Sequence, residues 1–228
     1  MTAVQQIVYG CDTAAWHRTA EAMGLVAPYP VTPEWAEFHG QGSLAIHHEF
    51  DAHPAGSVDL HLFVDDLDAA ERALAEWRAT RERMEGVGEL LTIPGNVRVT
   101  VSEGSVPARE GALTMQPIWF APDVERPRRI LEALGLRATI AADRGGWVEF
   151  ESESGSVGLH HADAESIGLS FLAADIEPLA ASLRDAGFDA AIVDEAFGRT
   201  IRFPDPDGID EIWINEPQLD MHGYHRVA

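Results

Sequence analysis

Apolar and polar positions along the 228-residue chain follow two alternating periods. Short apolar runs at 5–10, 58–64, 117–121 and 167–173 are typical of strands. Each run is followed within a few residues by an Asp and then by a longer amphipathic stretch typical of a helix. Further alternating segments follow every helix, so the pattern predicts four strand–helix units whose sheets are covered on one face by helices.

Aspartates and glycines predict the helix bounds. An Asp side chain can accept backbone N–H groups at a helix start, and Gly readily adopts the left-handed conformation past a helix end. Pro178 is compatible with a first turn, where the missing N–H has no helical partner. We expect helices from Asp12 to about Gly24, from Asp66 or Asp68 onward, from about Asp123 to Gly135, and from Asp175 to Gly187.

A repeat divides the chain in two. The segment "EWAEFHGQGSLAIHHEF" (34–50) matches "GWVEFESESGSVGLHHA" (146–162), and "EAMGL" (21–25) matches "EALGL" (132–136). Order and spacing persist through most of each copy, which indicates domain duplication. We predict an α+β protein of two tandem domains, each built of paired βαβββ units that form a curved sheet with helices on the outer face. The expected bounds are 1–105 and 115–228, the latter with a C-terminal tail, joined by a linker at 106–114.

Strand parity predicts which side chains share a face, because successive residues of a strand point to opposite sides. Leu44 and Ile46 should pack under the helices, which turns His47 to the concave face. A three-residue turn at 40–42 places Trp35 opposite His47, and a two-residue turn at 153–154 places Trp147 opposite His160 and Glu149 opposite Gly158. The missing side chain at Gly158 should leave room for a ligand beside Glu149.

The same parity predicts two pockets. The residues expected to line them are Trp35, Glu37, His47, Asp59 and His61 in the first copy, and Trp147, Glu149, His160, Glu211 and Trp213 in the second. Each of these residues also has an interpretation without a ligand. The Trp–His pairs can stabilise the sheet by themselves, as aromatic cross-strand pairs do. The acidic residues are equally explained by a solvated face of the sheet, and His61 by an ordinary position in a strand.

Charge and composition narrow the range of partners. The formal net charge is −22, and all 16 basic residues are Arg, a bias typical of a GC-rich bacterial genome. Such a surface repels nucleic acid and anionic lipid, so we expect a small-molecule ligand rather than either of these. Cys11 is the only cysteine, which excludes an internal disulfide and a thiolate zinc cluster. No signal peptide or membrane span is recognisable, so we expect a cytoplasmic monomer or homodimer.

These motifs, together with "FVDDLDAA" (63–70) and "FPDPDGIDEIWINE" (203–216), resemble the vicinal oxygen chelate superfamily over nearly the whole chain. That superfamily includes glyoxalase I, extradiol dioxygenases, and fosfomycin and bleomycin resistance proteins. The resemblance implies a metal held by His and Glu on the first and last strands of the units, where it polarises two substrate oxygens. The implied ligand positions are Gln5, Asp59 and about Val99 in the first copy, and Gln116, Gly168 and Glu211 or Ile212 in the second.

These positions lack the usual ligand set. Gln is a poor transition-metal ligand, and Val99 and Gly168 offer no ligating side chain. We therefore expect no metal cofactor of the usual kind.

Two functions remain open, and the sequence favours the first. The first function is the binding of a small aromatic molecule without a metal. Trp35 or Trp147 would be the stacking surface, and, if the molecule is a cation, Glu37 or Glu149 would be its counter-charge. The alternative is a lyase, isomerase or dioxygenase. It would use an atypical metal centre, such as His160 with Glu149 and Glu211 or His47 with Asp59 and His61, or a metal-free general base at Glu149 or His160.

Overall fold

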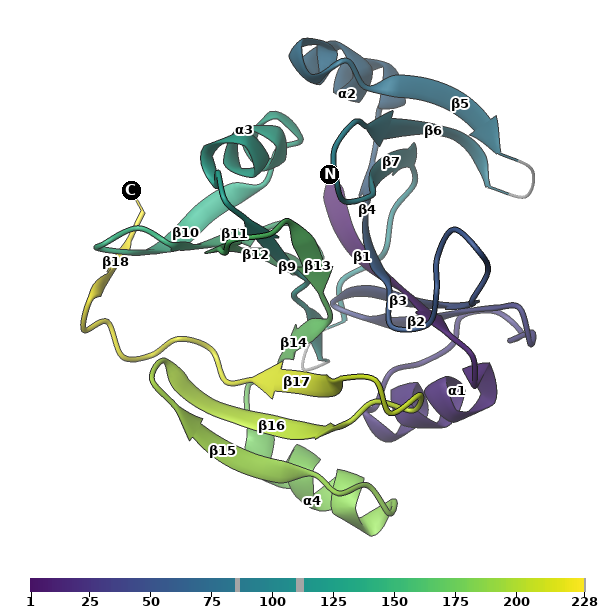
Figure 1. Ribbon diagram of the computed structural model, residues 1–228, viewed down its shortest axis with the longest axis vertical. Coiled ribbons are helices and arrows are strands. Elements are labelled where there is room, and N and C mark those ends of the chain that lie inside the picture. Colours follow the sequence, from purple (N-terminus) through teal and green to yellow (C-terminus); the bar gives the residue numbers. More distant parts are fainter. Residues whose placement is uncertain (85–86, 110–112, 228) are drawn as a thin grey trace.

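The strand–helix–strands unit occurs twice in each half of the chain (Figure 1). The structure is a computed structural model that describes residues 1–84, 87–109 and 113–227. The first half contains β1 (Thr2–Gly10), α1 (Thr13–Ala22), β2 (Trp35–Gly40), β3 (Gly42–His48), β4 (Val58–Val64), α2 (Leu67–Ala73), the 3-10 helix η1 (Ala75–Trp77), β5 (Thr80–Met84), β6 (Gly88–Ile93) and β7 (Val99–Glu103). The second half contains β8 (Thr114–Met115), β9 (Ile118–Ala121), α3 (Glu125–Ala133), β10 (Arg137–Ala142), β11 (Trp147–Glu151), β12 (Ser156–His161), β13 (Ser166–Gly168), β14 (Ser170–Leu172), α4 (Ile176–Asp185), β15 (Ala191–Glu195), β16 (Gly198–Pro204), β17 (Glu211–Asn215) and β18 (Tyr224–Arg226).

The first half forms one seven-stranded sheet in the order β2-β3-β1-β4-β7-β6-β5, in which the antiparallel pair β1–β4 joins the two units. In the second half the strand that corresponds to β4 is divided at Leu169 into β13 and β14. As a result, six strands (β13-β9-β12-β11-β10-β18) and five strands (β15-β16-β17-β14-β8) form separate sheets. The C-terminal segment crosses from β17 to β18, which pairs with the edge of β10 (Figure 1). The α+β prediction is confirmed.

Aspartate side chains cap three helices as predicted. Asp12 accepts from Ala15 N at 2.9 Å, and Asp175 accepts from Glu177 N at 3.2 Å. Asp66, rather than Asp68, caps α2. The third helix begins later than expected, at Glu125, and Asp123, two residues before it, accepts from the N–H of Glu125. Gly24, Gly135 and Gly187 follow α1, α3 and α4 with φ of +80°, +87° and +92°.

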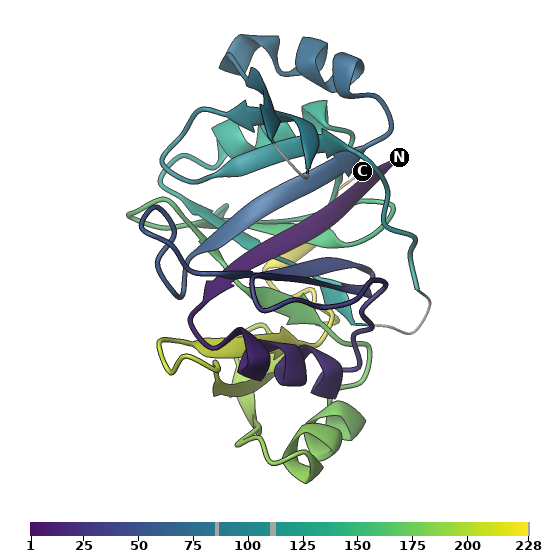
Figure 2. The same ribbon diagram turned by 90° about the vertical axis from the view of Figure 1, so that its right-hand side faces the viewer.

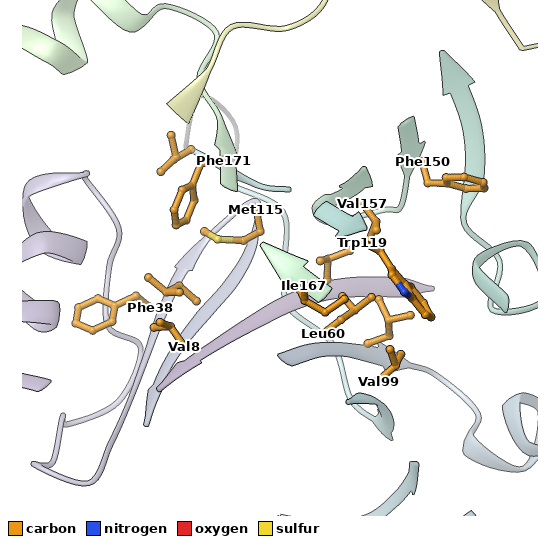
Figure 3. Close-up of a cluster of buried hydrophobic side chains, with 14 of the residues drawn as sticks. Val8, Phe38, Leu60, Val99, Met115, Trp119, Phe150, Val157, Ile167 and Phe171 are labelled. Carbon is orange, nitrogen blue, oxygen red and sulfur yellow. The ribbon is translucent and has the colours of Figure 1, made fainter. Parts of the chain in front are cut away.

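One buried hydrophobic cluster extends through both halves. Phe38, Leu44 and Ile46 are fully buried beneath α1, which confirms the predicted parity. Met115 and Phe171 of the second half lie near Val8 of the first half in this cluster, with Met115 between the other two (Figure 3). The helices lie outside the sheets, α1 and α4 toward one end of the molecule and α2 toward the other (Figure 2). None of the helices that the structure describes is long and apolar enough to span a membrane.

A reciprocal contact joins the halves. Gln41, in the β2–β3 hairpin, donates from its N–H to Leu113 O and accepts from Met115 N, at 2.9 and 2.8 Å. Ser154, its equivalent in the β11–β12 hairpin, accepts from Val4 N at 2.8 Å. Each hairpin therefore pairs with the first strand of the other half, as in a pseudo-twofold interface. Thr114, the last residue of the predicted linker, belongs to β8, and linker residues 110–112 lie outside the described residues.

Candidate functional site

The strand registers make the two halves comparable residue by residue. His47 and His160, equivalent in the repeat, lie opposite Tyr9 and Phe120. The same registers, continued through β4, β13, β7 and β17, match Gln5 with Gln116, Tyr9 with Phe120, Asp59 with Gly168, His61 with Ser170, Arg98 with Glu211, and Thr100 with Trp213.

The predicted cross-strand pairs are present in both halves. Trp35 lies opposite His47 with ring centroids 5.7 Å apart, and Trp147 lies opposite His160 with centroids 6.1 Å apart. Glu149 lies opposite Gly158, as the turn length predicted. The hairpins therefore present the same pattern of side chains to the concave face of each half.

In the first half, His61 fills the concave face. Its Nδ1 lies 2.7 Å from Thr100 Oγ1 and its Nε2 lies 2.9 Å from Ser102 Oγ. Burial lowers the pKa of His61 to about 4, so the ring is neutral near pH 7 and bridges two strands through both nitrogens. This arrangement agrees with the second interpretation of His61 from the sequence, that of an ordinary histidine in a strand.

Asp59 is also committed to neighbours of its own half. It accepts from Tyr9 OH at 2.9 Å and lies 3.2 Å from His53 Nε2 and 3.6 Å from Arg98 Nε. Burial raises the pKa of Asp59, an effect that the hydrogen bond from Tyr9 and the charges of His53 and Arg98 partly oppose. Burial and the nearby Asp59 also raise the pKa of Tyr9. The phenol and carboxyl thus occupy interior space with their own hydrogen bonds.

The remaining residues predicted for a first-half pocket contact neighbours within their own half. Glu37 pairs with His39 at 2.8 Å, and Trp35 is 38% exposed at the start of β2. His47 packs against Tyr9 at 5.3 Å between ring centroids. None of the predicted first-half residues, all of which the structure describes, lines the cavity found in the second half.

The second half contains a cavity of about 490 Å³. All five residues predicted for this half line it: Trp147, Glu149, His160, Glu211 and Trp213. Strand parity did not predict several other residues of the wall, because they come from more distant parts of the chain. These are Val8, Trp16, Gly56 and Val58 of the first half, and Gln218 and Tyr224 of the C-terminal segment. The cavity is therefore assembled from segments far apart in sequence.

A Phe–Gly pair stands where the first half has Tyr9 and Asp59. A Cβ on Gly168 would lie 2.9 Å from Cε2 of Phe120, so only glycine leaves the ring in its place. Phe120 packs against His160 with centroids 5.5 Å apart and presents an aromatic surface to the cavity. The two halves thus differ by a carboxyl and a hydroxyl group at one corner.

Glu149 is a half-buried carboxyl in the cavity wall. Its Oε2 accepts from Gln116 Nε2 at 3.0 Å, and its Oε1 accepts from Thr139 Oγ1 at 3.1 Å. Burial raises the pKa of Glu149, and the hydrogen bonds from Thr139 and Gln116, with a smaller effect of the Arg226 charge, oppose this only in part. Among the described residues, no Arg or His forms an ion pair with it. An ionised Glu149 would be stabilised by a cation entering the cavity.

The expectation of ligand space over Gly158 is wrong. A Cβ there would lie 2.9 Å from Cζ3 of Trp147 and 2.7 Å from Cδ1 of Ile118. The indole itself occupies the space, so Gly158 accommodates Trp147 rather than a ligand.

Strand parity decides between Glu211 and Ile212. All three residues border the cavity, but Ile212 is fully buried in the hydrophobic cluster, whereas Glu211 and Trp213 are more exposed and share the other face of β17. The Arg202 guanidinium lies 3.7 Å from the centroid of the Trp213 ring and 3.8 Å from Glu211. The Glu211 charge is therefore partly balanced by this Arg.

The positions implied for metal ligands do not fit a chelated ion. Val99 is buried in the hydrophobic core, the Gln116 amide is bonded to Glu149, and Phe120 covers Gly168. Within the ranges that the structure describes, no three His, Cys, Asp or Glu side chains gather as a metal site. This includes the two atypical centres considered from the sequence.

Comparisons with known proteins identify the fold of the chain. No family model matches the sequence, and no curated protein matches it either. A catechol 2,3-dioxygenase structure matches with a TM-score of 0.66 and 14% identity, covering 98% of this chain and 94% of that one. A Mn(II)-bound glyoxalase from Novosphingobium aromaticivorans matches with a TM-score of 0.63 and 12% identity, over 99% and 82% of the two chains.

A variant of homoprotocatechuate 2,3-dioxygenase from B. fuscum, in complex with HPCA, matches with a TM-score of 0.63 and 15% identity, over 96% of this chain and 71% of that one. The chain has the vicinal oxygen chelate fold. At these identities the likeness extends to the fold alone. The vicinal oxygen chelate fold accounts for the tandem βαβββ units, while the chemistry of the cavity depends on its own residues.

Proposed function

We propose that the protein binds a small aromatic cation in the second-half cavity without a metal ion. One observation carries the proposal: Glu149 lies half-buried in the wall of an aromatic-lined cavity, and no described Arg or His side chain forms an ion pair with it. Phe120, Trp147 and Trp213 supply faces for a planar ligand, and cation–π contacts add to the attraction of the carboxylate.

The rest of the wall supports the same ligand class. Of the lining residues that the structure describes, none is Arg and five are acidic: Glu149, Asp205, Asp210, Glu211 and Glu216. Glu216 is paired with Arg199 at 2.6 Å and Glu211 lies 3.8 Å from Arg202, whereas the ion pairs among the described residues do not include Glu149, Asp205 or Asp210. Burying an anionic ligand here would leave like charges facing each other, whereas a cation would relieve the cost of the buried carboxylate.

A lyase, isomerase or dioxygenase is the second candidate, and the likeness to dioxygenases and a glyoxalase favours it. A metal-free version would use Glu149 as a general base, because a raised carboxyl pKa brings proton transfer closer to neutral pH. Turnover of a hemithioacetal or a catechol, measured with and without added Mn²⁺ or Fe²⁺, would support this candidate over simple binding.

The test compares two ligands of nearly the same shape. N-methylacridinium is a permanent cation, and acridine is neutral at about pH 8. We expect saturable quenching of tryptophan fluorescence by the cation, with affinity on the order of tenfold above that for acridine and unchanged by EDTA. Equal affinities, or cation binding only after a divalent metal is added, would reject the proposal.

A further inference from the structure

A turn of the second half docks on the first helix of the first half. Asp207, between β16 and β17, accepts through Oδ1 from Asp12 N at 3.0 Å and from Cys11 N and Sγ at 3.2 and 2.9 Å. Its other oxygen, Oδ2, accepts from Trp16 Nε1 at 2.8 Å. One carboxylate therefore bonds to the start of α1 and to an indole on the same helix.

Trp16 is the largest first-half side chain in the cavity wall. It is 1% exposed and lines the cavity together with Val8, Gly56 and Val58. A Cβ on Gly10 would lie 2.8 Å from Asp207 Oδ2 and closer still to Trp16 Nε1. Gly10 thus leaves space for the bond between the indole and the carboxylate.

The equivalent end of the molecule lacks this arrangement. The repeat matches Trp16 with Pro127 and Gly10 with Ala121. There, Arg126 of α3 donates to Pro94 O of the turn between β6 and β7. Of these two equivalent ends, as far as the structure describes them, the Gly10–Trp16–Asp207 arrangement occurs at the one where Trp16 lines the cavity, which argues against a purely structural requirement of the fold.

Electrostatics agree with a strongly held carboxylate. Burial alone would raise the pKa of Asp207, but hydrogen bonds from Cys11, Trp16 and the Asp12 backbone outweigh burial and lower it. Asp207 is therefore ionised near neutral pH and acts as a permanent acceptor.

We propose that Asp207 is a positioning residue that fixes the Trp16 indole as the first-half wall of the cavity and so sets which ligands fit. This inference rests on the proposed binding function for its specificity element. The orientation of Trp16 by Asp207 stands on the geometry alone and can be tested without any ligand.

The decisive variant is Asp207→Asn. Its side-chain oxygen can still accept from Asp12 N, but its NH₂ group faces the indole N–H, and two donors cannot bond. We expect about fivefold weaker binding of N-methylacridinium, with a small change in melting temperature because the hydrogen bond from Asp12 N is retained. In a Trp16→Phe background, which has no indole N–H, the same substitution should produce no further loss.

Asp66→Asn is the matched control, since Asp66 caps α2 through Ala69 N at 2.8 Å and does not line the cavity. It should leave probe binding unchanged. An equal loss of affinity on adding Asp207→Asn to Trp16→Phe would show that Asp207 acts through the turn rather than the indole, and would overturn the proposal.

Hydrogen exchange of the Trp16 indole N–H, assigned with Trp16→Phe, supplies the ligand-free readout. We expect faster exchange in Asp207→Asn and no change in Asp66→Asn. Unchanged exchange in Asp207→Asn would reject the positioning role. Failure of the wild-type protein to bind either acridine probe would instead reject the proposed function, with the exchange result still deciding the role of Asp207.

Discussion

The two halves share a backbone plan but use their concave faces differently. In the first half, Tyr9 and Asp59 bond to each other, and His61 bridges Thr100 and Ser102. The second half has Phe120, Gly168 and Ser170 at the positions of Tyr9, Asp59 and His61, and there a cavity of about 490 Å³ remains. At the three positions compared, the second half lacks a hydroxyl, a carboxyl and an imidazole group, and the cavity lies beside these smaller side chains.

The two concave faces also differ in how their polar side chains are held. In the first half, the buried Asp59 and His61 side chains are hydrogen-bonded to Tyr9 and to Thr100 and Ser102 on neighbouring strands, so this part of the concave face is packed. In the second half, the corresponding surface exposes Glu149 to the cavity and holds it with two neutral donors. Burial raises the pKa of a carboxyl in both halves, but Asp59 is enclosed by partners of its own half, whereas Glu149 faces the cavity.

The largest effect is expected from acidifying the first-half core. The folded protein keeps His61 neutral down to its pKa of about 4, whereas in the unfolded chain it protonates near 6.5. Stability should therefore fall as pH drops from the unfolded value toward the folded one, by about 3 kcal/mol from this group. Urea unfolding across that range should show the slope in wild type and lose it in His61→Gln. An equal slope in both proteins would contradict the buried neutral histidine; exposed His48→Gln is the control.

Transferring the first-half pair to the second half should close the cavity. Phe120→Tyr with Gly168→Asp rebuilds the Tyr9–Asp59 arrangement and places side-chain atoms in the binding space. We expect cation affinity to fall on the order of a hundredfold. Gly168→Asp alone should be less stable than the pair, because its carboxyl meets the Phe120 ring without a donor. Retained binding in the double variant would show that the ligand lies elsewhere.

Removing the Trp147 indole should weaken binding about tenfold, since a stacking surface is lost. The Trp35→Ala substitution in the first half removes the equivalent residue and should leave affinity unchanged. Fluorescence titration and thermal melting of both variants separate the outcomes. A large loss of stability in Trp147→Ala with unchanged affinity would identify its packing over Gly158 as its sole role.

The smallest effect is expected for Glu149→Gln, with opposite signs for binding and stability. Because the folded-state pKa of Glu149 is raised, the carboxyl favours folding at low pH and disfavours it as pH rises through that pKa. The amide should therefore melt at a higher temperature near neutral pH, while N-methylacridinium affinity falls about fivefold and acridine affinity stays constant. Parallel losses for both probes would argue against a counter-charge.

Local features were predictable because they depend on neighbouring residues. Asp12 and Asp175 cap helices through amides two or three positions away, and turn length alone set the pairing of Trp147 with His160. The same reasoning identified the five second-half wall residues, since parity along a strand requires no knowledge of distant segments.

What the strand pattern could not reveal was which half holds a cavity and what completes it. Both copies offer the same Trp, Glu and His positions, and the difference arises where Tyr9 reaches Asp59 or Phe120 covers Gly168, across strands far apart in sequence. Trp16 of the first half lines the cavity and donates a hydrogen bond to Asp207 of the second half. A cavity is the volume that packed segments leave unfilled, and that quantity exists only after the halves have assembled.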